Sequence, residues 1–125
     1  MTAIDRQHTG SHHIDTTLID WQETGAPGFW LKPIFKDSQT GVSTALMKID
    51  PGAYTPDHAH DQLEEIYVLD GDFYDAEHSY GPGHYCQRAI GAMHEAGSKG
   101  GCTMLLLALV HISEPTRQAE ISHTV

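Results

Sequence analysis

The chain has 125 residues, of which 39% are hydrophobic and 19% charged, and its formal net charge is −10 at pH 7. This length fits one domain, and the composition is that of a globular protein rather than a disordered one. A chain this negative repels phosphate backbones, so we expect no nucleic-acid partner. The longest apolar run, Met104–Val110, is far shorter than a membrane span, and no signal-peptide pattern is visible. We therefore expect no membrane association and a cytoplasmic location.

Short β-prone runs separated by Gly, Pro and Asp account for most of the chain. Residues 1 to about 17 are polar and lack periodicity, which predicts a loose N-terminal arm. The runs that follow are Phe29–Phe35, Val42–Ile49, Glu64–Leu69, Phe73–Tyr74, His84–Gln87 and Cys102–Ile112. No window carries the apolar stripe of an amphipathic helix. Many short strands with turn signals between them predict an all-β antiparallel sandwich or barrel.

Alternation along the strands also predicts which side chains share a face. In Val42–Ile49, alternate residues share a face, so Ala45, Met47 and Ile49 point to one side of the strand. The run that begins at Cys102 is apolar at successive positions. Such a run predicts a strand that is covered on both faces.

Histidine is strongly over-represented, with ten residues in the chain. His58 and His60 are two positions apart, so on a strand both point to the same side. Neutral imidazoles are good donors to divalent first-row metals. Glu64 follows after a short loop, and His94 lies about thirty residues further on. A His-x-His pair alone carries little weight in so histidine-rich a chain, and the flanking pattern makes it specific.

That pattern resembles two motifs of the cupin family. The first reads Gly52, five residues, His58-x-His60, three residues, Glu64, six residues, Gly71. The second is similar to Gly83, five residues, Ala89-Ile-Gly91, two residues, His94. Ala89 stands where the family usually has Pro, and Ser98 stands where it often has Asn. Neither position is a metal ligand, so the departures leave the predicted site intact.

Within the cupins, the chain is most similar to the ChrR-like type and to acetylacetone-cleaving dioxygenases. The likeness lies in the segments Glu64–Gly71, Phe73–Asp75, Tyr80–Tyr85 and Gly101–Thr103. It implies a double-stranded β-helix, the RmlC-like jelly-roll barrel. The expected organisation is a polar arm over residues 1–17, a cupin barrel over 18–114 and a tail over 115–125. The family habit also implies a homodimer, and the short polar stretch before the barrel argues against an anti-sigma role.

The resemblance implies one divalent metal ion held by His58, His60, Glu64 and His94. Mixed N and O donors leave Fe, Zn, Mn and Ni open. Glu65 is the rival of Glu64, although the spacing to Gly71 favours Glu64. His84 and His111 are expected in the core or behind the ligands, and His78 in solvent. Side chains that are candidates for a pocket lining, or for core or dimer contacts, are Phe29, Trp30, Met47, Tyr54, Tyr67 and Met104.

Three functions follow as hypotheses. The leading one is a small-molecule metalloenzyme, such as a non-haem dioxygenase acting on a dicarbonyl or a similar oxygenated substrate. A non-catalytic zinc-sensing or ligand-sensing domain like that of ChrR is the second. The third is an isomerase or cyclase that uses its histidines as acid and base groups. No Ser or Cys lies in a nucleophile-elbow context, so triad chemistry has no support.

Overall fold

The computed structural model describes residues 3–5, 10–59 and 61–110. Within this part of the chain it contains strands and one short 3-10 helix, η1 (Thr16–Leu18), which confirms the all-β prediction. The strands are β1 (Ile4–Asp5), β2 (Gln22–Glu23), β3 (Phe29–Lys36), β4 (Val42–Ile49), β5 (Tyr54–Ala59), β6 (Gln62–Gly71), β7 (Phe73–Tyr74), β8 (Ser79–Tyr80), β9 (Tyr85–Arg88), β10 (Met93–Gly97) and β11 (Cys102–Val110). Among the described residues, no helix has the length and hydropathy that a membrane crossing requires.

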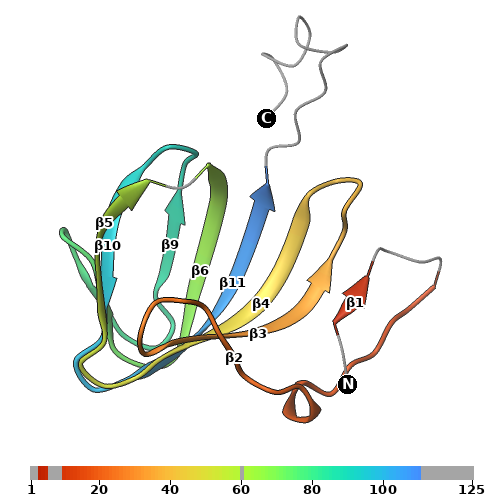
Figure 1. Ribbon diagram of the computed structural model, residues 1–125, viewed down its shortest axis with the longest axis horizontal. Helices are drawn as coiled ribbons and strands as arrows, with labels where there is room; N and C mark the ends of the chain where they lie inside the picture. Colours follow the sequence, from red (N-terminus) through yellow and green to blue (C-terminus); the bar gives the residue numbers. More distant parts are fainter. Residues whose placement is uncertain (1–2, 6–9, 60, 111–125) are drawn as a thin grey trace, which may run out of the picture.

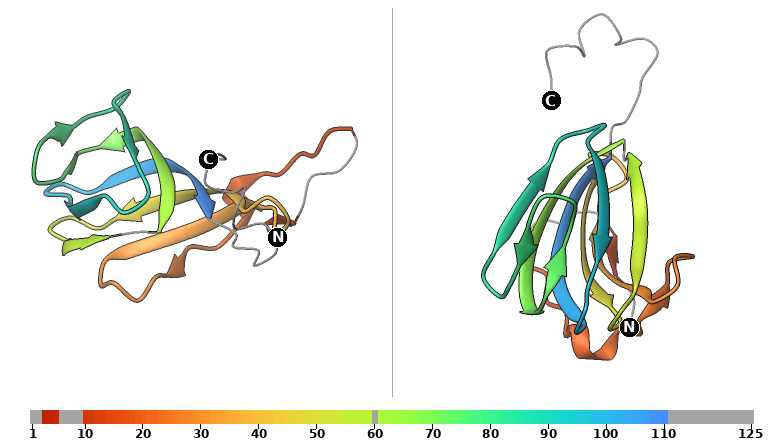
Figure 2. Two further views of the ribbon diagram at one scale, coloured as in Figure 1. Left: turned by 90° about the horizontal axis from the view of Figure 1, so that it is seen from above. Right: turned by 90° about the vertical axis from the view of Figure 1, so that its left-hand side faces the viewer.

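Two sheets wrap around a common interior (Figure 2). The larger sheet has the order β1-β3-β4-β11-β6-β9, with β2 also paired to β3, and the smaller has the order β5-β10-β7-β8. Figure 1 shows β9, β6, β11, β4 and β3 in a row across the molecule, with β5 and β10 at one end of it. The β1–β3 pair is parallel, whereas the other pairs described are antiparallel. This arrangement confirms the predicted jelly-roll barrel.

Alternation along the strands places the apolar core between the sheets. In β4, Met47 and Ile49 share a face as predicted, and the structure turns this face inward, with Ile49 1% exposed. β11 contributes Met104, also 1% exposed, to the same interior. The buried apolar cluster consists of Phe29, Ile49, Ile66, Val68, Phe73, Ala96, Cys102 and Met104. Side chains from both sheets therefore form one core.

Strands β2, β5, β8 and β10 were not among the predicted apolar runs, and of these β5 and β10 carry predicted ligands. β5 contains Pro56 and Asp57, and β10 contains Glu95 and Gly97, which are residue types with low strand propensity. Their strand conformation follows from pairing with each other, in an antiparallel register that sets His94 opposite His58. β1 lies inside the predicted arm, and the last residues of the run predicted to end at Ile112 lie outside the described part.

A turn at Gly71 connects the end of β6 to the small sheet. Gly71 has φ +83°, and an added Cβ would lie 2.0 Å from the carbonyl oxygen of Gly101. Only glycine fits this close approach without displacing backbone. The other motif glycines, Gly52, Gly83 and Gly91, also have positive φ, as their place in turns predicts.

Ser98, which replaces the Asn common in the family, links β10 to β11. It is 1% exposed, its hydroxyl donates to the Asp72 carbonyl oxygen at 2.5 Å, and it accepts the Gly101 N–H at 2.8 Å. The carboxylate of Asp72 accepts two further N–H groups of the same loop. The serine is therefore a structural residue that fixes the loop after His94.

Candidate metal centre

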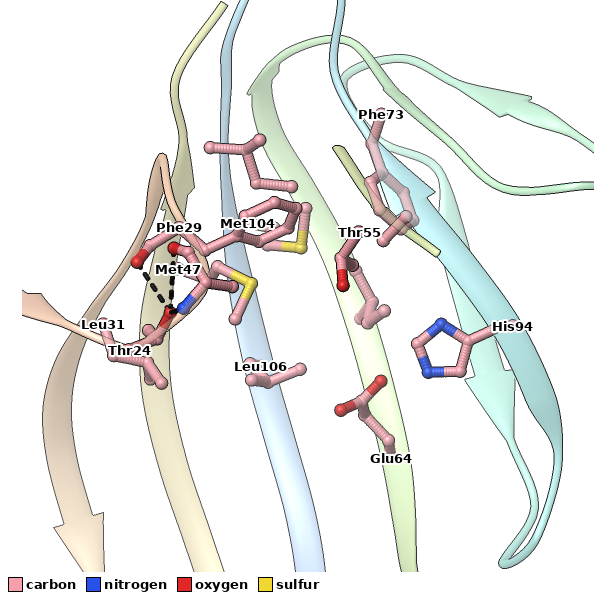
Figure 3. Close-up of a pocket in the computed structure, with 14 residues that line it drawn as sticks. Thr24, Phe29, Leu31, Met47, Thr55, Glu64, Phe73, His94, Met104 and Leu106 are labelled. Atoms are coloured by element: carbon pink, nitrogen blue, oxygen red, sulfur yellow. Dashed lines mark hydrogen bonds between the residues drawn. The ribbon is translucent and has the colours of Figure 1, made fainter. Parts of the chain in front are cut away.

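A cavity of about 240 Å³ lies between the two sheets. Most of its lining is apolar and includes Phe29, Leu31, Met47, Ile66, Phe73, Met104 and Leu106. The polar side chains in the lining are those of Thr24, Thr55, Glu64 and His94. Figure 3 shows Glu64 and His94 pointing toward the same part of the cavity, from the side opposite Thr24 and Met47. The two ionisable side chains of the lining therefore lie at one end of a largely apolar chamber.

Glu64 reaches this end from β6. It alternates with the buried residues Ile66 and Val68 and is itself only 8% exposed. Its neighbour Glu65 faces the other side of the sheet, where its carboxylate accepts a hydrogen bond from the Tyr85 hydroxyl at 2.5 Å. Of the two glutamates that the sequence offers, Glu64 is therefore the one that faces the cavity.

His94 reaches the same end from β10 and is 8% exposed. Its Nδ1 lies 3.4 Å from the carbonyl oxygen of Glu95. Because a carbonyl oxygen only accepts hydrogen bonds, this contact favours a proton on Nδ1 and a lone pair on the buried Nε2. Histidine ligands of metals commonly have this tautomer, with the second nitrogen held by a carbonyl or carboxylate. The residue thus fits the predicted ligand role.

The two remaining predicted donors are His58 and His60. The backbone of His58 is paired directly with that of His94 across β5 and β10. The side chain of His58, and the whole of His60, lie outside the described residues. Within the described part, no group of three or more His, Cys, Asp or Glu side chains is arranged to hold a metal ion. The structure therefore brings together Glu64 and His94 and does not place the other two imidazoles.

A charged network behind Glu64 was not predicted from the sequence. Arg88 on β9 is the direct cross-strand neighbour of Glu64, and its Nε lies 3.9 Å from Glu64 Oε1. On its other side, Arg88 Nη2 lies 3.0 Å from Asp75 Oδ2. The Arg88 and Asp75 side chains are 11% and 4% exposed. The only feature of the sequence that could have indicated a buried Arg88 is its position two residues after Cys86, which places both on the same face of a strand.

Asp75 is held more firmly than an ordinary surface carboxylate. It accepts the N–H groups of Glu77 and His78 at 2.9 and 2.8 Å and the Tyr80 hydroxyl at 2.9 Å. Burial raises the pKa of Asp75, but these hydrogen bonds and Arg88 outweigh it and lower the pKa to about 2. Asp75 therefore stays ionised and anchors Arg88 at neutral pH.

The structure bears on several of the remaining predicted residues. Phe29, Met47 and Met104 line the cavity, whereas Trp30, Tyr54 and Tyr67 lie outside its lining. His78 is exposed, as predicted. The prediction for His84 was wrong, because this residue is exposed and its Nδ1 accepts the Gly81 N–H at 3.2 Å in a turn. His111 lies outside the described residues.

The protein is a cupin barrel: two facing sheets enclose an apolar cavity, with Glu64 and His94 at one end of it. Residues 9–112 match the ChrR Cupin-like domain family, so the chain belongs to this family. A comparison with curated proteins finds no match.

Solved structures confirm the fold. The anti-sigma factor ChrR of Rhodobacter sphaeroides, in complex with SigE, is 23% identical with a TM-score of 0.63, over 74% of this chain and 51% of that chain. An acetylacetone dioxygenase from Acinetobacter johnsonii is 14% identical with a TM-score of 0.71, over 87% and 80%. The polyketide cyclase RemF of Streptomyces resistomycificus is 21% identical with a TM-score of 0.68, over 89% and 94%. Proteins of different function thus share this barrel, and at these identities the likeness shows the fold alone.

Proposed function

We propose that the protein is a metal-dependent enzyme that acts on a small oxygenated molecule, with dioxygenase chemistry as the leading reaction class. His58, His60, Glu64 and His94 would hold one divalent ion. The observation that carries the proposal is the convergence of Glu64 and His94, from different sheets, on one end of the apolar cavity. The first motif, which contains Glu64, would also supply the other two donors, His58 and His60.

The cavity itself selects the kind of substrate. Its volume of about 240 Å³ is below the range typical of drug-sized ligands, which is about 300–1,000 Å³. Aromatic, branched and Met side chains would bury an apolar body and exclude water, while the polar end would receive a chelating group. A bound metal would act as a Lewis acid toward two oxygens of the substrate and, if it is iron, would supply oxygen chemistry. A dicarbonyl with small apolar substituents matches this lining.

Two other functions use the same residues differently. A zinc-sensing or ligand-sensing domain would bind metal without turnover, and membership of the ChrR-like family supports this alternative. In an isomerase or cyclase, His94 and Glu64 would exchange protons with the substrate, and the fold shared with RemF keeps this alternative open.

The first experiment measures metal by elemental mass spectrometry in protein purified without a His-tag. Wild type is compared with His58→Ala/His60→Ala. Stoichiometric Fe, Mn or Ni that is absent from the double variant, together with oxygen uptake on dicarbonyl substrates, supports the proposal. Zinc without turnover favours the sensor, and turnover that survives chelation favours the isomerase or cyclase. Absence of metal after anaerobic reconstitution would overturn the metalloenzyme.

We further propose that the protein is a homodimer that pairs through the outer face of the large sheet. This face carries Val42, Tyr67 and Leu69, which are 37%, 43% and 46% exposed. Leu105 and Leu107 of β11 lie on the same face, because they pair with Tyr67 and Glu65 of β6. An exposed sheet face that carries several apolar side chains is typical of an interface. Light scattering should give a dimer for wild type and a monomer for Leu107→Glu; a monomeric wild type would refute the proposal.

A further inference from the structure

Arg88 is a nearly buried cation that is not one of the proposed metal ligands. Both salt bridges found among the described residues involve it, one with Glu64 and one with Asp75. A buried guanidinium is costly unless opposite charges and hydrogen bonds compensate it. Its place directly opposite Glu64 in the β6–β9 register therefore calls for an explanation.

The two contacts of Arg88 are unequal. The Nη2–Asp75 distance of 3.0 Å is that of a charge-assisted hydrogen bond. The distance of 3.9 Å between Arg88 Nε and Glu64 Oε1 is too long for a hydrogen bond but short enough for an ion pair. Nε is buried and has no hydrogen-bond acceptor within the described residues. Arg88 is thus fixed at one end by Asp75 and directs a buried donor toward the carboxylate at the other.

Arg88 does not belong to the cavity lining, whereas Glu64 does. It is therefore placed to act on the site through Glu64 rather than by contact with a substrate. The guanidinium is planar and keeps its charge under all ordinary conditions, which suits it to hold two carboxylates at once. Asp75, in turn, is fixed by two backbone N–H groups and a tyrosine hydroxyl.

We propose that Arg88 is a positioning residue that orients the carboxylate of Glu64 for metal binding, with Asp75 as its anchor. The inference rests on the proposed metal site and adds a residue at a position that the cupin motifs leave unspecified. Groups that orient metal ligands typically change metal affinity by about 10- to 100-fold when they are removed. Arg88→Met should therefore weaken metal binding by about this factor, measured by competition with a chromogenic chelator.

A double-mutant cycle separates positioning from a general structural effect. On a Glu64→Gln background, Arg88→Met should cause little further loss of metal affinity, because the ligand that it orients is already altered. Equal losses on both backgrounds would overturn the proposal. Arg88→Lys should lose affinity in part, since it keeps the charge without the planar fork. Val68→Ala, a destabilising core control outside the cavity lining, should leave metal affinity unchanged.

A second readout needs no metal. In the metal-free protein, the NMR signal of the Arg88 Nε–H group should move on Glu64→Gln and stay unchanged on Glu65→Gln. An Nε–H signal that ignores Glu64 would overturn the positioning role. A wild type that binds no metal would refute the proposed function, and this signal would still show whether Arg88 and Glu64 are coupled.

Discussion

Replacing Asp75 by Asn tests the charged network directly. The substitution keeps the size of the side chain and removes the charge that faces Arg88. The pKa of Asp75 is lowered from its ordinary value of 3.8 to about 2, because hydrogen bonds to the ionised form outweigh the opposing effect of burial. A tenfold change in an acid constant corresponds to about 1.4 kcal/mol, so ionised Asp75 stabilises the folded state by about 2 kcal/mol at neutral pH.

The expected loss in Asp75→Asn is about 2 to 4 kcal/mol at pH 7. The upper figure arises because the variant also leaves Arg88, which is 11% exposed, without its closest counter-charge. In wild type, the contribution of Asp75 is fully present above pH 4. It is lost as the pH falls toward 2, because the unfolded chain takes up the proton first. The difference in stability between the two proteins should therefore narrow over this range.

Urea unfolding followed by circular dichroism at several pH values between 7 and 2 measures this difference. Asp20→Asn, at an exposed position, is the matched control and should change the free energy of unfolding by less than about 0.5 kcal/mol. A loss below about 1 kcal/mol for Asp75→Asn at pH 7 would refute the reasoning. A loss of unchanged size down to pH 2 would also refute it.

Other regions of the barrel allow further predictions. Gly71→Ala should abolish folding or lower the free energy of unfolding by more than about 3 kcal/mol, because the new methyl would meet the Gly101 carbonyl oxygen at 2.0 Å. Gly52→Ala has the same φ of +83° but open space around the new methyl, so it should lower the free energy of unfolding by only about 1 kcal/mol, and melting curves compare the two variants. Burial raises the pKa of the Cys102 thiol to about 11, so alkylation at pH 8, followed by mass spectrometry, should label this residue only after unfolding. Met104→Ala should cost about 2–5 kcal/mol in urea unfolding, since the side chain is 1% exposed, and a loss under 1 kcal/mol would contradict the packing described.

The barrel was predictable because its long strands follow the rules of local sequence. β4 matches the predicted run Val42–Ile49, and alternation correctly grouped Met47 and Ile49 on one face of it. The choice of Glu64 over Glu65 as the inward-facing residue followed from motif spacing. β5 and β10 lie outside the predicted apolar runs because they contain Pro, Asp, Glu and Gly, which have low strand propensity. Their strand conformation depends on a partner distant in the sequence.

Arg88 could not be assigned from the sequence for a different reason. An arginine in a strand normally lies on the solvent side, and no local pattern reveals that Asp75, thirteen residues earlier, folds back to meet it. A carboxylate such as Glu64 cannot be buried in an apolar chamber without compensation, and Arg88 provides a positive charge beside it. The charge of Arg88 is balanced by the carboxylate of Asp75. That carboxylate in turn accepts hydrogen bonds from two backbone N–H groups and the Tyr80 hydroxyl, which are neutral donors. Under the proposals above, the apolar cavity would limit which substrates fit, while the network outside the cavity would hold the Glu64 carboxylate in place for a cation.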